Sequence, residues 1–153
     1  MKAICILPNH GYVIFSQCCK KHTVKVHFKL HGFMSNATHA IHIHEFGDLS
    51  DGCTSLGPHY NPDNTTHGSR EIPENPRHAG DLINNFTTNE DGEFKYTYID
   101  KLLSIDDIVG RSVVIHEGID DLGVGKGSSK KESLVTGNAG NRICCGIIGW
   151  KKN

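Results

Sequence analysis

Short segments of alternating polar and apolar residues place the strongest constraint on the fold of this chain. Residues 23–30 alternate in this way, and residues 93–98 do so after the Asp91-Gly92 turn signal. A period of two puts the apolar side chains on one face of an extended chain, which predicts half-buried antiparallel strands. The other segments predicted to form strands are residues 2–7, 12–16, 39–46, 112–116 and 143–150.

No long amphipathic helix interrupts these segments, and only residues 128–134 have a helical pattern, of one or two turns. Two stretches, residues 47–82 and 117–141, carry no strand pattern. Loops of this length inside a compact domain are usually functional or disordered, and these two hold most of the unusual residues. The 153 residues suffice for one domain. The sequence therefore predicts an all-β sandwich or barrel with two long functional loops.

Composition narrows the function classes. A formal net charge of -1 gives no electrostatic basis for binding nucleic acid or a membrane surface. The apolar stretch near the amino terminus, residues 3–7, is shorter than a secretory signal needs, and no apolar run approaches a membrane span. We therefore expect a cytoplasmic protein that binds neither nucleic acid nor membrane. The unusual number is 11 histidines, since histidine is the commonest metal ligand.

The pair His42-x-His44 falls in a predicted strand, so both imidazoles lie on the same face. Such a pair can bind one metal ion, although so short a motif is as often a pair of histidines with no ligand. His116 strengthens the metal interpretation. It ends an apolar strand at the point where the second long loop begins, which is a typical position for a site residue.

The first long loop contains further candidate ligands. His78 and Asp81 are spaced to chelate an ion from a single turn, and His59 and His67 precede them. Three histidines and a carboxylate suit zinc, whereas the set His42, His44 and His116, made of histidines only, suits copper. The remaining histidines have no comparable arrangement and are predicted to be surface or locally hydrogen-bonded residues: His10, His22, His27, His31 and His39.

Five motifs in order, IHIHEFGD, DGCTSLGPHYNP, RHAGDL, VVIHEGIDDLG and TGNAGNRICCGIIG, resemble the copper/zinc superoxide dismutase family of the eukaryotic, intracellular type. The resemblance covers nearly the whole chain. It implies one domain over residues 1–153 with a Greek-key β-sandwich or flattened barrel of about eight antiparallel strands. It also implies an oxidoreductase of antioxidant defence, which converts superoxide to dioxygen and hydrogen peroxide by one-electron cycling of copper.

The resemblance further implies one copper and one zinc ion per subunit. The residues that match the copper ligands are His42, His44, His59 and His116, and those that match the zinc ligands are His59, His67, His78 and Asp81. His59 would thus bridge the two ions through its two ring nitrogens and take part in catalysis.

Three other residues match supporting positions of the family. Asp120 matches a carboxylate that accepts hydrogen bonds from one copper and one zinc histidine, here His42 and His67. Arg142 matches the catalytic arginine that attracts and orients the superoxide anion, and Thr136 would form part of the channel wall. The loop before Thr136 departs from the family's charge pattern, because Val135 stands where a basic residue is common. We therefore expect Arg142 still to steer superoxide towards the site, within an electrostatic field that is distributed differently from the family's usual one.

The resemblance implies an intrasubunit disulfide between Cys53 and Cys145. The adjacent Cys144 and Cys145 should face opposite sides of a strand, so both cannot reach Cys53. We expect the remaining thiols to be reduced: Cys5, Cys18, Cys19 and Cys144.

Small or apolar residues match the homodimer contact of eukaryotic members, which predicts a symmetric homodimer. These residues are Phe46, Gly47, Val109, Gly110, Ile147 and Trp150. Asn141 and Ile143 replace prolines that make some relatives depend on a copper chaperone, so we expect partial independence of that partner.

Two alternatives fit the residues less well. A non-catalytic member of the family would lack copper ligands or the arginine, and this chain has both. A zinc hydrolase would need a free carboxylate base beside an open zinc ion. That alternative also leaves His42, His44 and His116 unexplained.

Overall fold

The computed structural model describes residues 1–18 and 22–152. The strands are β1 (Lys2–Leu7), β2 (Gly11–Gln17), β3 (Val24–Leu30), β4 (Thr38–His44), β5 (Asn84–Thr87), β6 (Phe94–Asp100), β7 (Ser112–His116) and β8 (Arg142–Trp150). Short helices lie between them: α1 (Ile105–Ile108), α2 (Lys130–Thr136) and the 3₁₀ turns η1 (Thr54–Leu56) and η2 (Gly127–Ser129).

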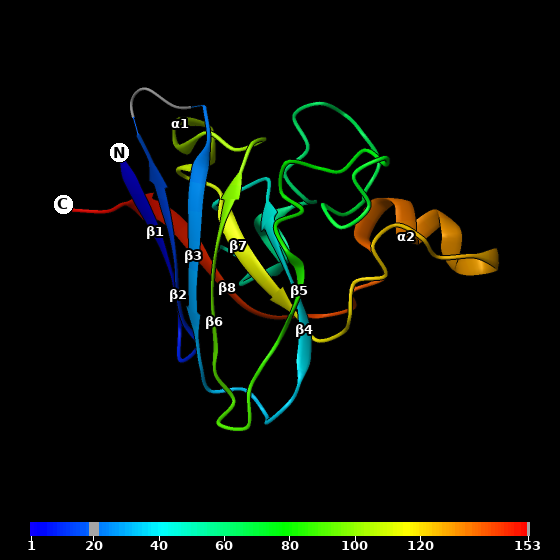
Figure 1. The fold of residues 1–153 in the computed structure, drawn as a ribbon, viewed down its shortest axis with the longest axis horizontal. Helices are drawn as coiled ribbons and strands as arrows, with labels where there is room; N and C mark the ends of the chain where they lie inside the picture. The colour runs from blue at the N-terminus through cyan, green and yellow to red at the C-terminus, as the bar shows by residue number, and fades with distance from the viewer. Residues whose placement is uncertain (19–21, 153) are drawn as a thin grey trace.

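The eight strands form one antiparallel sheet in the order β5-β4-β7-β8-β1-β2-β3-β6, which curls into a nearly closed barrel (Figure 1). β3 pairs with β6, and β4 crosses over to pair with β7, so the connections are of the Greek-key kind. Within the described residues no ladder joins β5 to β6, which leaves one seam without backbone hydrogen bonds. The predicted all-β Greek-key fold is confirmed.

Alternation in the sequence decides which faces form the core. In β3, Val24, Val26, Phe28 and Leu30 are buried, whereas Lys25 and Lys29 between them are exposed. Each large apolar side chain buried in this way stabilises the fold by roughly 1.5–3 kcal/mol. The periodicity of residues 23–30 was therefore sufficient to predict this strand and its inward face.

Two elements are present that the sequence did not predict, β5 and α1. β5 has only four residues, two of them asparagine, and it is a strand because it pairs with β4 from Thr38↔Thr87 to Ile41↔Asn84. α1 is a single turn that buries Ile105 and Ile108. Neither is long enough to show a period in the sequence. The predicted helical segment at 128–134 is confirmed as η2 and α2.

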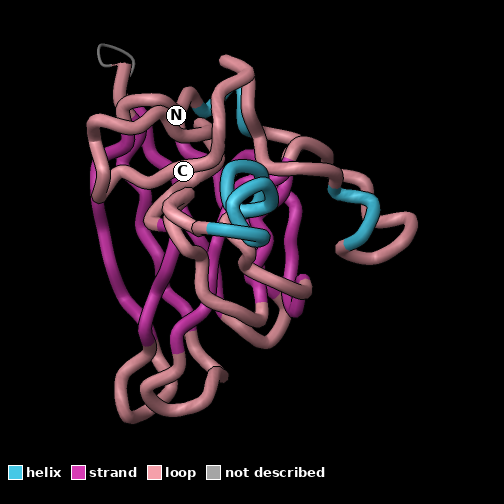
Figure 2. The backbone as a smooth tube through the Cα atoms, turned by 90° about the vertical axis from the view of Figure 1, so that its right-hand side faces the viewer, coloured by secondary structure: helices cyan, strands magenta, loops and turns pink. Residues whose placement is uncertain are grey.

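Both long loops lie on the same side of the barrel. One joins β4 to β5, and the other joins β7 to β8 and carries α2 (Figure 1). Figure 2 looks onto this side, with α2 and the loops in front of the strands. The two loops together therefore lie against the part of the barrel where β4 pairs with β7.

A disulfide ties the first loop to β8. Cys53 and Cys145 are bonded, with their Cα atoms 5.9 Å apart, which confirms the predicted bridge. In the chain-entropy model, a bond across a sequence separation of 92 residues stabilises the fold by roughly 4–5 kcal/mol.

Other cysteines are inside the barrel. Cys5 and Cys144 are free and buried, and burial raises the pKa of Cys5 to about 12 and that of Cys144 to about 11. Thiols with such pKa values are weak nucleophiles at neutral pH. Cys18 is exposed, and Cys19, which was also predicted to be reduced, lies outside the described residues. In the part of the chain that the structure describes, no helix has the length and apolar character to cross a membrane.

Candidate metal centre

β4 and β7 deliver three of the predicted ligands to the space beneath the loops. β4 is buried along both faces from Ala40 to His44, because the isoleucines face the core while His42 and His44 face the covering loops. β7 pairs with β4 and ends at His116, which is also buried. The period of two that the sequence showed at His42-x-His44 is therefore what brings both rings to one face.

The backbone sets the orientation of His44 and His116. Nδ1 of His44 lies 2.9 Å from the Gly57 carbonyl oxygen, and Nδ1 of His116 lies 3.0 Å from that of Gly140. A carbonyl oxygen only accepts, so each Nδ1 donates and each Nε2 keeps a lone pair. The two Nε2 atoms are 3.3 Å apart. Two lone pairs held this close suit a shared cation.

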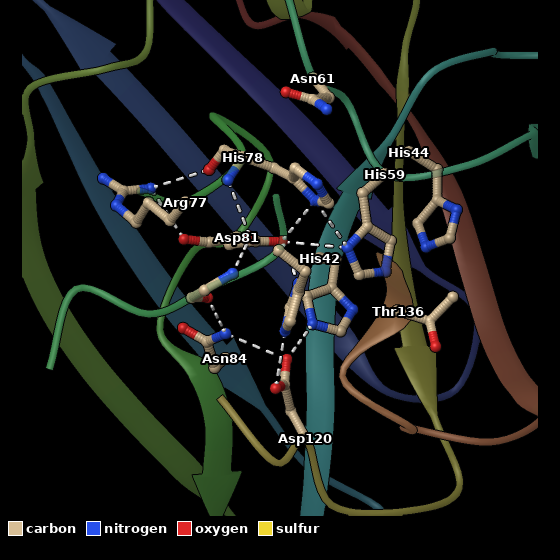
Figure 3. A network of polar contacts seen from close by, with 12 residues as sticks. His42, His44, His59, Asn61, Arg77, His78, Asp81, Asn84, Asp120 and Thr136 are labelled. Atoms are coloured by element: carbon tan, nitrogen blue, oxygen red, sulfur yellow. Dashed lines mark hydrogen bonds and ion pairs between the residues drawn. The ribbon is translucent and has the colours of Figure 1, made fainter. Parts of the chain in front are cut away.

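Asp120 orients one histidine on each side of the cluster. Its Oδ2 accepts from Nε2 of His42 at 2.6 Å, and its Oδ1 accepts from Nε2 of His67 at 2.8 Å (Figure 3). Since both Nε2 atoms donate, Nδ1 of each ring keeps a lone pair when the ring is neutral. Both Nδ1 atoms are buried, and in the described part of the chain that of His42 has no hydrogen-bond partner, while that of His67 lies 3.0 Å from Asp81 Oδ1.

His59 lies between the two groups with its ring nitrogens on different sides. Its Nδ1 is 3.0 Å from Asp81 Oδ1 and 3.4 Å from His78 Nδ1. Its Nε2 is buried and has no hydrogen-bond partner among the described residues, and its ring stacks on that of His42 at 4.0 Å between centroids. Figure 3 shows the His59 ring between His44 and the pair His78 and Asp81. A ring placed in this way can serve two ions at once.

The two carboxylate oxygens of Asp81 have different roles: one is held by the backbone of the loop, and the other faces the histidines. Oδ2 accepts from the backbone N–H of His78 at 2.9 Å and of Gly68 at 3.2 Å. Oδ1 lies within 3.0–3.3 Å of Nδ1 of three histidines: His59, His67 and His78. The loop thus fixes the carboxylate from behind and leaves one oxygen for a cation.

The donors fit the copper and zinc ions that the sequence predicted. Within the described residues, two groups of four have ligand atoms within 4.8 Å of one another: His42, His44, His59 and His116, and His42, His59, His67 and Asp81. His78 is outside the second group, although its Nδ1 is 3.3 Å from Asp81 Oδ1. All seven predicted ligand residues are therefore in one buried cluster. Its buried lone pairs, from imidazoles and one carboxylate, are the donors that zinc and copper prefer.

Burial keeps most of these histidines neutral. It lowers the pKa of His59 to about 3 and that of His116 to about 4, and it also lowers the pKa of His42 and His44. Neutral imidazole is the form that binds metal ions. A metal ion entering the His42, His44 and His116 side therefore has few protons to displace at neutral pH.

His67 is the exception. Burial lowers its pKa, but hydrogen bonds to Asp120 and Asp81 outweigh burial and raise the pKa to about 9. For the two carboxylates, burial favours the protonated form, yet the hydrogen bonds from histidines prevail and hold the pKa of Asp81 and of Asp120 below the ordinary range. Without a metal ion, His67 is therefore protonated on both ring nitrogens at neutral pH and lies between the carboxylates of Asp81 and Asp120.

A cavity of about 330 Å³ leads to His44, His59 and His116. Arg142 lines it and donates to the carbonyl oxygens of Cys53 at 2.7 Å and Gly57 at 2.6 Å. The guanidinium is therefore held in place by the loop that the disulfide fastens. Thr136, Glu132 and Val135 also line the cavity, and Thr136 donates through Oγ1 to Glu132 Oε1 at 2.8 Å.

Two residues of the cluster were not identified from the sequence. Arg77 donates to the carbonyl oxygens of Asp81 at 2.8 Å and His78 at 3.3 Å, and pairs with Asp100 at 3.0 Å. Its position next to His78 was the one feature of the sequence that could have identified Arg77 as part of the cluster. Asn84 donates to Asp120 Oδ2 at 3.0 Å, and no local pattern marks it.

Comparisons with known proteins agree with this arrangement. Residues 9–148 match the family model described as copper/zinc superoxide dismutase. The chain is 47% identical over 142 residues to a Cu-Zn superoxide dismutase of Schizosaccharomyces pombe, covering 91% of this chain and 88% of that one. It is 45% identical, with the same coverage, to one from Saccharomyces cerevisiae.

A solved structure is also similar. The crystal structure of the clock protein EA4 superposes with a TM-score of 0.84 at 35% identity, covering 97% of this chain and 93% of that one. Fold, cluster and relatives lead to one conclusion. The chain belongs to the copper/zinc superoxide dismutase family, as an oxidoreductase of antioxidant defence that uses copper and zinc to convert superoxide to dioxygen and hydrogen peroxide.

Proposed function

We propose that copper is held by His42, His44, His59 and His116, and zinc by His59, His67, His78 and Asp81. The observation that carries this assignment is the position of the two ring nitrogens of His59. Its Nδ1 faces Asp81 and His78, while its Nε2 has no hydrogen-bond partner in the part of the chain that the structure describes. Copper, when bound, supplies the one-electron chemistry of dismutation, and zinc supplies a fixed positive charge.

His78, and not His42, is proposed as the third histidine of the zinc site. His42 has one lone pair available, on Nδ1, because its Nε2 donates to Asp120. That nitrogen can bind a single ion, and the copper set requires it. Nδ1 of His78 lies close to both Asp81 Oδ1 and His59 Nδ1, at 3.3 and 3.4 Å.

Metal analysis of two variants tests the assignment. We expect His78→Ala to lose zinc and keep copper, and His116→Ala to lose copper and keep zinc, because each removes a ligand of one ion only. Metal content per chain is measured after loading with both metals, alongside dismutase activity. If His78→Ala retained zinc while His42→Ala lost it, the alternative group of four would hold zinc and the assignment would be wrong.

Arg142 and Thr136 are proposed to guide the substrate. Among the described residues that line the cavity, Arg142 alone has a permanent positive charge, and superoxide is an anion. Glu132 also lines the cavity and carries the opposite charge, and Val135 adds none. The attraction therefore comes from Arg142, within a field that Glu132 weakens.

His59 is proposed to hold a proton for the reaction at Nε2. Two superoxide anions and two protons give one dioxygen and one hydrogen peroxide, so protons must reach the cavity. His59 lines this cavity, and its Nδ1 is turned towards Asp81. Nε2 is therefore the ring atom that can take a proton from water and donate it, with the second proton coming from water directly.

The protein is also proposed to be a homodimer through Phe46, Gly47, Val109, Gly110, Ile147 and Trp150. Phe46 and Trp150 are 52% and 57% exposed, although both are large and apolar. Gly47 packs on Gly110, where a Cβ atom would lie 2.0 Å from the carbonyl oxygen, and Gly110 donates to Ile148 at 2.8 Å. These contacts gather the three segments on one face, and exposed apolar patches of this kind are typical of interfaces.

Light scattering tests the dimer. We expect a mass twice the 16.8 kDa of one chain. Trp150→Glu should give a monomer, because it buries a charge in the interface. Tyr96→Glu is the matched control, since Tyr96 is 46% exposed on β6, far from β8 in the sheet order, and it should leave the dimer intact. A monomeric wild-type chain would contradict the proposal.

Three further features are proposed. Residues 1–153 form one domain, supported by a single apolar core shared by β1, β3, β4 and β7. The protein is cytoplasmic, supported by the free buried thiols, which persist in reducing compartments. A copper chaperone is partly dispensable, supported by Asn141 and Ile143, which stand where chaperone-dependent relatives have proline.

A further inference from the structure

Asn84, the first residue of β5, contacts both the Asp120 carboxylate and the first long loop. Its side chain is fully buried, and its Nδ2 donates to Asp120 Oδ2 at 3.0 Å and to the carbonyl oxygen of Gly68 at 2.8 Å (Figure 3). We propose that Asn84 is a positioning residue, whose amide fixes the carboxylate that aims the His42 and His67 rings. This inference rests on the proposed ligand assignment.

The orientation of the amide follows from its neighbours. Both partners of Nδ2 are oxygens that only accept, so turning the amide over would place oxygen against oxygen in both contacts. In the observed orientation, Oδ1 of Asn84 is buried and, among the described residues, has no partner. An unsatisfied buried oxygen is unfavourable. The two donated hydrogen bonds must therefore outweigh it.

The backbone of Asn84 is unfavourable as well. Its φ is +57°, in the left-handed region, inside a strand where such values are rare. Asparagine tolerates this conformation better than most residues. A buried residue with an unusual backbone angle and an unsatisfied oxygen is typical of a place where the surrounding structure requires that one side chain.

What the structure requires at this point is a fourth donor on Asp120. Oδ2 accepts from His42 and Asn84, and Oδ1 accepts from His67 and from the backbone N–H of Leu122 at 2.7 Å. With a donor pair on each oxygen, the carboxylate plane cannot rotate. Both rings that it orients are therefore fixed together.

The second bond of Asn84 reaches the zinc side directly. Gly68 follows His67, and its N–H donates to Asp81 Oδ2 while its carbonyl oxygen accepts from Asn84. One short segment is thus held between the zinc carboxylate and Asn84. Loss of the amide is expected to loosen Asp120 and the His67 segment at the same time.

Three variants separate the amide from the backbone. Asn84→Gly removes the amide and accepts the positive φ without strain. Asn84→Asp keeps the shape and tolerates the same φ, but it places an acceptor against Asp120 Oδ2 and the Gly68 oxygen. Asn64→Gly is the matched control, because Asn64 has φ +52° in the first long loop, is exposed, and makes no side-chain hydrogen bond with the described residues.

Zinc affinity is measured by competition with a chromophoric chelator on the full-length chain. We expect Asn84→Gly to weaken zinc binding by roughly 10- to 100-fold, as other residues that orient ligands do, and Asn84→Asp to weaken it further. Asn64→Gly should match the wild type. If only the shape and backbone conformation of Asn84 mattered, the order of zinc affinities would be reversed, with Asn84→Asp close to the wild type and Asn84→Gly weaker.

A spectroscopic readout tests the rings themselves. In the diamagnetic copper(I) and zinc form, NMR follows the Nε2–H protons of His42 and His67, which we expect to exchange with water faster in Asn84→Gly by roughly tenfold or more. Unchanged exchange, or zinc affinity within twofold of the wild type, would overturn the role of Asn84 while leaving the ligand assignment intact. A wild-type chain with no zinc at His67, His78 and Asp81 would overturn both.

Discussion

Replacing Arg142 by glutamine is expected to lower kcat/KM for superoxide by roughly 10- to 100-fold, because it removes the permanent positive charge that lines the cavity. The kcat/KM of Arg142→Lys should lie between those of the wild type and Arg142→Gln. Lysine keeps the charge but cannot donate to the carbonyl oxygens of both Cys53 and Gly57 as arginine does. The measurement is kcat/KM by pulse radiolysis or stopped flow on metal-loaded protein.

Ionic strength provides the second test of this prediction. The kcat/KM of the wild type should fall as salt is added, because mobile ions screen the attraction between Arg142 and the anion. In Arg142→Gln that dependence should flatten or reverse, since Glu132 then dominates the cavity wall. Metal content must be equal in all variants. A glutamine variant with the wild-type rate and salt dependence would show that guidance comes from elsewhere.

Zinc binding to the metal-free protein is expected to strengthen steeply with pH, by a factor on the order of 10² to 10³ between about pH 6 and pH 9. The reason is the proton on His67, whose pKa is raised to about 9. Zinc must displace that proton, so its apparent affinity rises about tenfold per pH unit until His67 is neutral. Calorimetry in buffers of different ionisation enthalpy should detect the release of about one proton per zinc ion near neutral pH.

The stability of the metal-free protein should change in the opposite direction. The folded-state pKa of His67 is above its value of 6.5 in the unfolded chain, so the bound proton stabilises the fold fully below pH 6.5. This contribution is lost as the pH rises through about 9. An NMR titration that found His67 losing its proton at or below pH 6.5 would contradict both expectations.

The sequence predicted the fold and the site correctly where the position of a side chain follows from the two-residue repeat of a strand. Alternation gave β3 its buried face, and the same period put His42 and His44 on one side of β4. Other features depend on partners distant in the chain. β5 exists because β4 lies beside it, and the proton on His67 depends on Asp81 and Asp120, which come from two different loops. No local pattern contains such information.

Asn84 is the clearest case of what the sequence could not reveal. Asn84 and Asp120 are 36 residues apart, and only the folded chain brings the amide to the carboxylate. Arg77 is intermediate, since its place beside His78 was visible but its pairing with Asp100 was not. The ligands were predictable as members of motifs, whereas the residues that aim them became visible only through contacts.

The unpaired seam between β5 and β6 makes metal loading relevant to self-association. With no ladder between these strands, each has an edge whose backbone groups another chain could pair with. The first long loop runs directly into β5, and Asn84 begins that strand. Ions bound by this loop would therefore also restrain the start of β5 and the free edge of that strand. Chains that lose their metals should expose it first, and they should form intermolecular sheet more readily than loaded ones.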